Sequence, residues 1–128
     1  MAALSNTHAS ALLAYSLNNG SVPLYIALFT AAPSGGSAGQ EISTGGYTRM
    51  SITFGSPSLV NNVMTCSNSA QVEWQNFTAA ISGVGYWGIF NAQTGGNMLW
   101  YGSFSLQKDI AVGDSIVIPA GNLSIGLA

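Results

Sequence analysis

The chain has 128 residues and almost no charge: Lys and Arg number 2, Asp and Glu 4, and charged residues make up 5% of the sequence against roughly 25% in an average protein. Two cations cannot neutralise a phosphate backbone, which excludes nucleic acid as a partner, and no apolar run approaches the roughly 18 residues of a membrane-spanning helix, so no membrane contact is expected. An exterior of small polar and apolar side chains with a net charge of only -2 favours coverage by partner subunits.

The first predicted element is a helix over residues 4–18. Apolar residues fall on one helical stripe at Leu4, Ala9, Leu12, Leu13 and Leu17. Ser5 or Asn6 is the expected N-cap. The residues at 18–20, Asn-Asn-Gly, tolerate the left-handed conformation and should end the helix.

Residues 22–128 are predicted to be β structure. Residues 24–30 are almost continuously apolar, which predicts a strand buried on both faces, and residues 33–39 form a predicted loop. Residues 47–54 alternate, with Met50, Ile52 and Phe54 expected to point inward and Arg49 outward. Further strands are expected at residues 63–65, 69–74, 115–118 and 123–127, with Ala70, Val72 and Trp74 sharing one face.

The clearest local pattern is a β-hairpin. Residues 86–90 and 98–101 are aromatic-rich runs, and a glycine-bearing loop joins them. Cross-strand aromatic pairs are expected to stabilise it, each by roughly 0.2–1 kcal/mol over alanine.

Seven or eight short strands separated by turns favour a β-sandwich or a small barrel. We therefore predict a mainly β fold: a single domain over residues 1–128, with a jelly-roll-like β-sandwich at 22–128 behind the helix at 4–18. The lone Cys66 excludes an intrachain disulfide, and no Lys or Arg marks a secretory signal at the N-terminus. Both features fit synthesis and assembly in a reducing cytoplasm.

Four segments, in order, carry a resemblance to a known family. Residues 24–33, 45–55, 88–99 and 109–127 resemble motifs of short virion proteins of tailed bacteriophages, usually labelled tail-fibre or capsid decoration (cement) proteins. This chain departs from the family's motifs at two positions. The family's Asp before the proline is Ala32 here, and the Asp that is frequent in the family's hairpin is Asn91. Both departures remove a carboxylate, so no role that needs either carboxylate is expected of this chain.

The residues predict no enzyme. His8, on a surface helix, and Cys66, expected as a small core residue, do not suggest a nucleophile–base pair. Asp109 and Asp114 are close in sequence, but Asp114 lies in a predicted turn, where Asp binds its own backbone. Four scattered carboxylates and one His match no metal-ligand spacing, so neither a metal nor a cofactor is expected.

The function expected from the resemblance, in the absence of coiled-coil heptads or repeats, is a capsid decoration (cement) protein. It would sit on the capsid surface of the virion as a homotrimer, bound to the major capsid protein, and stabilise the shell. Arg49, Trp87 and Trp100 are the expected interface residues. The alternatives are a tail-fibre or tail-tip module for host recognition, and a glycan-binding domain that uses an aromatic face of Trp74, Tyr86, Trp87, Trp100 and Tyr101.

Overall fold

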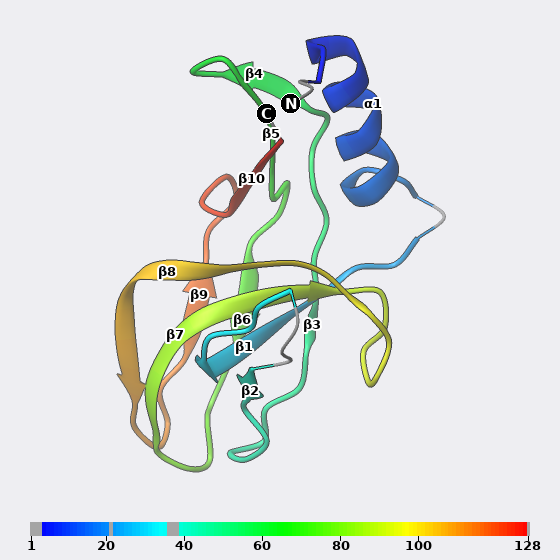
Figure 1. Ribbon diagram of the computed structural model, residues 1–128. Coiled ribbons are helices and arrows are strands. Elements are labelled where there is room, and N and C mark those ends of the chain that lie inside the picture. The colour runs from blue at the N-terminus through cyan, green and yellow to red at the C-terminus, as the bar shows by residue number, and fades with distance from the viewer. Residues whose placement is uncertain (1–3, 21, 36–38, 128) are drawn as a thin grey trace. The chain divides into compact units, whose positions relative to one another are not determined.

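The computed structural model describes residues 4–20, 22–35 and 39–127 (Figure 1). The described residues form one helix and a series of antiparallel strands. Their bounds are α1 (Asn6–Leu17), β1 (Tyr25–Ala31), β2 (Gln40–Glu41), β3 (Met50–Ser51), β4 (Ser58–Val60), β5 (Val63–Ser67), β6 (Val72–Trp74), β7 (Ile81–Phe90), β8 (Met98–Ile110), β9 (Ile116–Ile118) and β10 (Ser124–Leu127). The predicted mainly β class with one N-terminal helix is confirmed. The sandwich arrangement stays a prediction.

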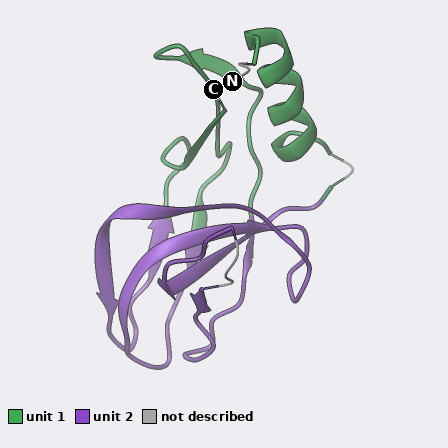
Figure 2. Ribbon diagram, in the orientation of Figure 1, with its two compact units in different colours: residues 1–22, 52–72, 118–128 green, residues 23–51, 73–117 purple. Residues whose placement is uncertain are grey.

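The residues cluster into two compact units, each built from segments that are separated in the sequence (Figure 2). Unit 1 comprises residues 1–22, 52–72 and 118–128, and unit 2 comprises residues 23–51 and 73–117. The prediction of a single domain over residues 1–128 remains a prediction. Part of the predicted loop at 33–39, namely residues 36–38, lies outside the described residues.

Unit 1 contains α1 and a three-stranded sheet of order β10-β5-β4. The Ser5 hydroxyl caps the helix, accepting a hydrogen bond from the His8 N–H at 3.2 Å. The buried face of α1 consists of Ala9, Leu13 and Leu17, and the helix packs against β5. Leu12, expected on this stripe, is 40% exposed. The buried residues lie four positions apart and form one line along the helix, and Leu12 lies to the side of that line.

A buried asparagine ties the C-terminal segment into unit 1. The Asn68 side-chain amide donates to the carbonyls of Ala70 (2.9 Å) and Pro119 (3.0 Å), and its oxygen accepts from the Leu123 N–H (2.9 Å). Backbone hydrogen bonds also join Asn68 to Leu123 and Gly121. Asn68 is only 2% exposed, and these partners satisfy the polar groups that burial would otherwise leave unpaired.

Unit 2 is centred on an antiparallel sheet of order β2-β1-β7-β8, with β3 also paired to β1. The predicted burial of the first strand on both faces is confirmed, since Ile26, Ala27, Leu28 and Phe29 are all at most 1% exposed. The Phe29 and Phe90 rings stack at 6.2 Å between centroids. Gly88 makes room for this stack, because a Cβ there would lie 3.0 Å from the Phe29 ring.

The predicted hairpin is confirmed as β7 and β8, which are joined by residues 91–97 and drawn in Figure 1 as two long, curved strands. The prediction that aromatic residues pair across it is wrong. Trp87 faces Gly102, and Tyr101 faces Gly88, so each large side chain has a glycine opposite. The directly opposed aromatic pairs join β7 to β1 instead: Tyr25 with Phe90, and Phe29 with Tyr86.

The segment at 47–54 is much less regular than its alternation predicts. Only Met50–Ser51 forms a strand, although Ile52 and Phe54 are buried as expected. Arg49, expected to point outward, is only 8% exposed. The correction has a physical cause: acceptors on neighbouring segments surround the guanidinium, so its burial does not leave it unpaired.

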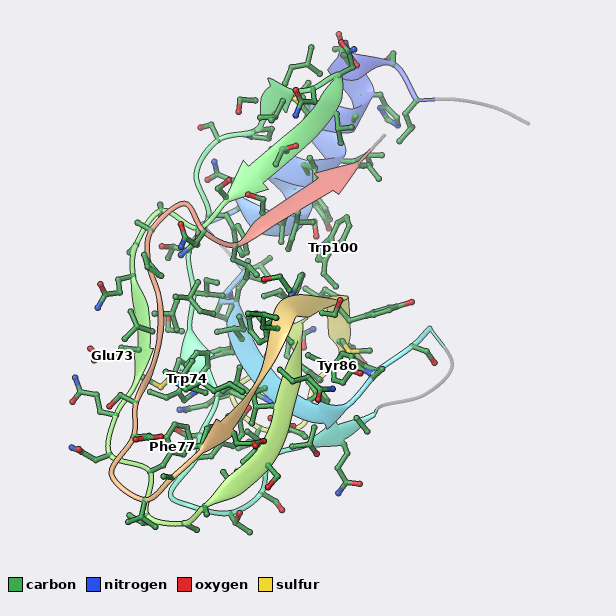
Figure 3. The ribbon with its side chains drawn as sticks, turned by 90° about the vertical axis from the view of Figure 1, so that its left-hand side faces the viewer. Glu73, Trp74, Phe77, Tyr86 and Trp100 are labelled. Carbon is green, nitrogen blue, oxygen red and sulfur yellow. The ribbon has the colours of Figure 1, made fainter. Side chains whose placement is uncertain are left out.

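The strands β6 and β9 pair as a two-stranded sheet. In Figure 3, Trp74 and Phe77 lie on the inner side of the chain, and Glu73 lies on the opposite side. Trp74 is 3% exposed, and its indole N–H donates to the Thr48 carbonyl at 2.9 Å. Of the three residues predicted to share a face, Val72 and Trp74 are buried, whereas Ala70 is exposed.

Candidate functional site

The most elaborate polar arrangement in unit 2 is built around Arg49. Its guanidinium forms a two-point ion pair with the Glu41 carboxylate: Nε lies 2.9 Å from Oε2, and Nη2 lies 2.9 Å from Oε1. The side chains are 9% and 27% exposed, respectively. Paired, near-parallel hydrogen bonds of this kind fix the relative orientation of both groups as well as stabilising them.

The same guanidinium holds the β7–β8 loop. Its Nη1 donates to the carbonyls of Ala92 (3.0 Å) and Gly95 (2.7 Å), and its central carbon lies 3.7 Å from the centroid of the Phe90 ring. Arg49 thereby joins the residues around β2 and β3 to a loop more than forty positions later in the chain. The position of the Arg49 guanidinium over the Phe90 ring is a favourable cation–π arrangement.

Tyr47 completes the network. Its hydroxyl donates to Glu41 Oε2 at 2.7 Å and accepts from the Leu28 N–H of β1 at 3.0 Å. Burial, followed by the hydrogen bond to Glu41, raises the pKa of Tyr47 well above its ordinary value. A tyrosine hydroxyl is protonated at neutral pH even at its ordinary pKa, so that of Tyr47 acts as a donor to the carboxylate.

The loop itself is closed by Asn91. Its side-chain oxygen accepts from the Asn97 N–H at 2.8 Å, and the Asn91 N–H donates to the Asn97 carbonyl at 3.2 Å. Because this bond requires only a side-chain oxygen acceptor, asparagine performs it without a carboxylate. The sequence departure at Asn91 therefore preserves the local geometry of the loop.

A surface hollow of about 500 Å³ lies beside this network. It is lined by Glu41, Ile42, Tyr47, Thr48, Arg49, Gln93, Thr94 and Gly95. The volume lies within the roughly 300–1,000 Å³ typical of small-molecule sites. The lining combines an apolar side chain, an aromatic ring, an internally compensated ion pair, and hydroxyl and amide groups, so it offers polar contacts without net charge.

The three predicted interface residues occupy different environments. Arg49 lies in the network just described, Trp87 is 7% exposed and packs over Gly102, and Trp100 is half-buried on β8 (Figure 3). A Cβ at position 102 would lie 2.6 Å from the Trp87 ring, so the glycine is what allows this packing. Their roles at an interface remain predictions.

The five residues of the predicted aromatic sugar-binding face are not all exposed. Trp74 and Trp87 are buried, and of the remaining aromatics only Tyr101 is largely exposed, at 47%. Trp87 packs over Gly102, and the Trp74 indole on β6 reaches the Thr48 carbonyl, so both rings lie in the interior of unit 2. The five aromatic residues therefore do not share one exposed face, and glycan binding through the others among them stays a prediction.

Four titratable residues considered from the sequence lie outside the Arg49 network: His8, Cys66, Asp109 and Asp114. His8 is exposed on α1, and Cys66 is fully buried in β5, where burial raises the pKa of its thiol. The Asp114 carboxylate accepts from the Ala111 N–H at 2.9 Å, which confirms its turn role, and Asp109 accepts from the Gly83 N–H at 2.8 Å.

Among the described residues no cluster of three His, Cys, Asp or Glu side chains could hold a metal, and no helix there is long and apolar enough to span a membrane.

Sequence reasoning identified Arg49 but missed Glu41, Tyr47 and Phe90. The available signal was compositional: with 4 acidic residues in the chain, an Arg and a Glu eight positions apart are the natural candidates for a pair. The long-range contact with the hairpin loop has no local signature, because it depends on the pairing of β1 with β7.

Comparison with known proteins assigns the chain to a family. Residues 3–126 match the family model described as "Podophage GP4 fiber I protein gp80", and no curated protein matches. A fibre family overturns the expectation of a capsid decoration (cement) protein on the capsid surface. Coiled-coil heptads and repeats are therefore not required of a fibre family, since this mainly β chain belongs to one without them. The chain is a non-enzymatic structural component of the phage virion and belongs to the family of the podophage GP4 fiber I protein gp80, a family of tail-fibre proteins.

Proposed function

We propose that this chain is a tail-fibre module that takes part in host recognition and assembles as a homotrimer. The observation that carries the proposal is the family match, which spans residues 3–126 and so nearly the whole chain. Membership of a fibre family implies association with other tail or fibre components. Host recognition and the trimeric state are our own extension of that match.

The exposed apolar side chains support contact with other subunits. In unit 1 they are Leu12, Tyr15, Leu59 and Val60; in unit 2 they are Leu99, Tyr101, Leu106, Val112 and Val117. With only 6 formally charged residues in the chain, few charges surround them to oppose association.

The strand β8 offers the largest share of this surface in unit 2. It is the last strand of its sheet, runs for 13 residues, and carries the exposed residues Leu99, Tyr101 and Leu106. A strand at the end of a sheet that also carries exposed apolar side chains is a natural site for contact with another chain. Trp100, half-buried on the same strand, is the predicted interface residue that retains exposed surface outside the Arg49 network.

Two measurements test the proposal. Quantitative mass spectrometry of purified virions gives the copy number relative to the major capsid protein, and a particle lacking the chain is assayed for adsorption to host cells. A few copies per virion together with loss of adsorption are expected. A copy number close to that of the capsid subunit, or normal adsorption without the chain, would refute a role in host recognition.

The homotrimer is tested separately by light scattering of the purified full chain. A mass three times that of the 13.1 kDa subunit is expected, and Trp100→Ala should lower the trimer fraction at a fixed protein concentration. A wild-type chain that stays monomeric at high concentration would rule out self-association through its own surface.

A further inference from the structure

The hollow beside Arg49 has the chemistry of a binding site for uncharged, hydroxyl-rich molecules. Its one cation and its one carboxylate are paired at 2.9 Å on two sets of atoms, so each compensates the charge of the other. A free anion would have to displace Glu41 from the guanidinium, and a cation would have to compete with Arg49 for the carboxylate. Neither exchange is favourable for a buried, two-point pair.

The polar groups of the hollow nevertheless retain hydrogen-bonding capacity. A carboxylate has about four lone-pair positions, and contacts of Glu41 with other described residues use three: Tyr47 and Arg49 Nε on Oε2, and Arg49 Nη2 on Oε1. Its side chain is 27% exposed, so a hydroxyl donor from outside has access to it. The exposed side chains of Gln93 and Thr94 add an amide and a hydroxyl, which both donate and accept.

The hollow is also preorganised. Arg49 fixes the loop through the carbonyls of Ala92 and Gly95, and the Asn91–Asn97 contact closes the base of that loop. A loop that is already held in place loses little further conformational entropy when a ligand binds. Donors and acceptors in fixed positions next to an aromatic ring and an apolar side chain match an alternation of hydroxyl groups and C–H faces.

We propose that this hollow binds the neutral sugar units of a host-surface glycan, with Glu41, Gln93 and Thr94 as its hydrogen-bonding groups. The proposal rests on the host-recognition function above for the source of the sugar, and on the geometry of the hollow for its class. The aromatic face predicted from the sequence plays no part in this site.

The binding test uses the isotope-labelled full chain and nuclear magnetic resonance. The probes are glucose, galactose, mannose and N-acetylglucosamine; glucuronate, sialic acid and inorganic phosphate serve as charged counterparts. We expect saturable shifts of the amides of residues 41–49 and 93–95 with at least one neutral sugar and none of comparable size with the charged probes. Absence of such shifts with every neutral sugar, or a preference for the charged probes, overturns the proposal.

Matched variants locate the site. Gln93→Ala and Thr94→Val should each weaken binding roughly fivefold, the effect of losing one ordinary hydrogen bond, while leaving the thermal midpoint unchanged. Gln75→Ala is the control, because Gln75 is also exposed in unit 2 but does not line the hollow. Equal affinity in all three variants would place the sugar elsewhere and refute the assignment.

Adsorption assays separate this inference from the proposed function. Particles carrying the doubly substituted Gln93→Ala, Thr94→Val chain are compared with particles that lack the chain. If only the lacking particles fail to adsorb, the fibre role stands and the role of the hollow falls. If both adsorb normally while the purified chain binds sugar, the hollow binds as proposed and the host-recognition function falls.

Discussion

Replacing Arg49 with leucine tests whether the guanidinium network holds unit 2 together. The substitution introduces an apolar side chain of moderate size and removes the two-point pair with Glu41 and the two hydrogen bonds from Nη1 to Ala92 and Gly95. It leaves a carboxylate that is three-quarters buried without its counter-ion. The predicted result is a large loss of stability.

The magnitude follows from the surroundings of the pair. Removing one partner of a buried ion pair costs about 3–5 kcal/mol. Glu41 is 27% exposed and Gly95 is exposed, so water rehydrates part of what is lost, which favours the lower end, about 3 kcal/mol. For a chain of this length that corresponds to a fall in Tm of roughly 10–15 °C.

Urea and thermal unfolding at a fixed protein concentration measure the effect. Lys108→Leu is the matched control, because it removes the other cationic residue, which is exposed and makes a long hydrogen bond of 3.4 Å from Nζ to the Ser115 carbonyl. We expect the free energy of unfolding to change by less than about 0.5 kcal/mol. The double variant Arg49→Leu, Glu41→Leu should recover roughly 1–2 kcal/mol, since contacting residues couple. An Arg49→Leu chain as stable as the control, or a double variant no better than the single one, would refute the reasoning.

Three further predictions concern single contacts. Gly102→Ala should cost about 1–3 kcal/mol by forcing the Trp87 ring to move, whereas Gly20→Ala, with open space around it, should change the unfolding midpoint little. The folded-state pKa of Tyr47 is raised, so its contribution to stability is present below the ordinary tyrosine pKa of about 10 and is lost as pH rises above it. Tyr47→Phe should therefore show a shallower fall in urea midpoint than wild type between neutral and strongly alkaline pH; parallel curves would contradict this. Asn91→Asp should stay within about 0.5 kcal/mol of wild type in urea unfolding, and Asn91→Ala should lose about 1 kcal/mol, because only the side-chain oxygen accepts from Asn97; equal losses would show that the contact is unimportant.

The elements with strong local patterns were predictable. The first strand, the hairpin and the N-terminal helix follow from a continuous apolar run, from two aromatic runs around a glycine-bearing loop, and from helical spacing. The alternation at residues 47–54 predicted buried Ile52 and Phe54 correctly but not the strand. Within this segment Met50–Ser51 pairs with β1, whereas Phe54 forms an isolated bridge to Asn68. A strand requires a continuous partner as well as a pattern.

The candidate site was predictable only in part. The scarcity of charge made Arg49 stand out, but not its direction, because the partners that stabilise its buried position come from β2 and from a loop after β7. The hydrogen-bonding role of Asn68 was equally hidden, since its partners Pro119 and Leu123 are more than fifty positions away. Contacts of this kind depend on the tertiary arrangement, which one sequence does not encode in any short motif.

The positions of the two cationic residues also affect how readily proteases outside the cell can cleave the chain. Trypsin-like proteases cleave after Lys and Arg, so the chain offers them two bonds, after Arg49 and after Lys108. The first lies at the start of β3 beside a buried guanidinium, and the second lies within β8. Cleavage needs a segment that can leave its strand, whereas nicking concentrates at exposed loop tips, and residues 91–97 contain neither target residue. The ion-pair network therefore also shields one of the two peptide bonds that such a protease could cut.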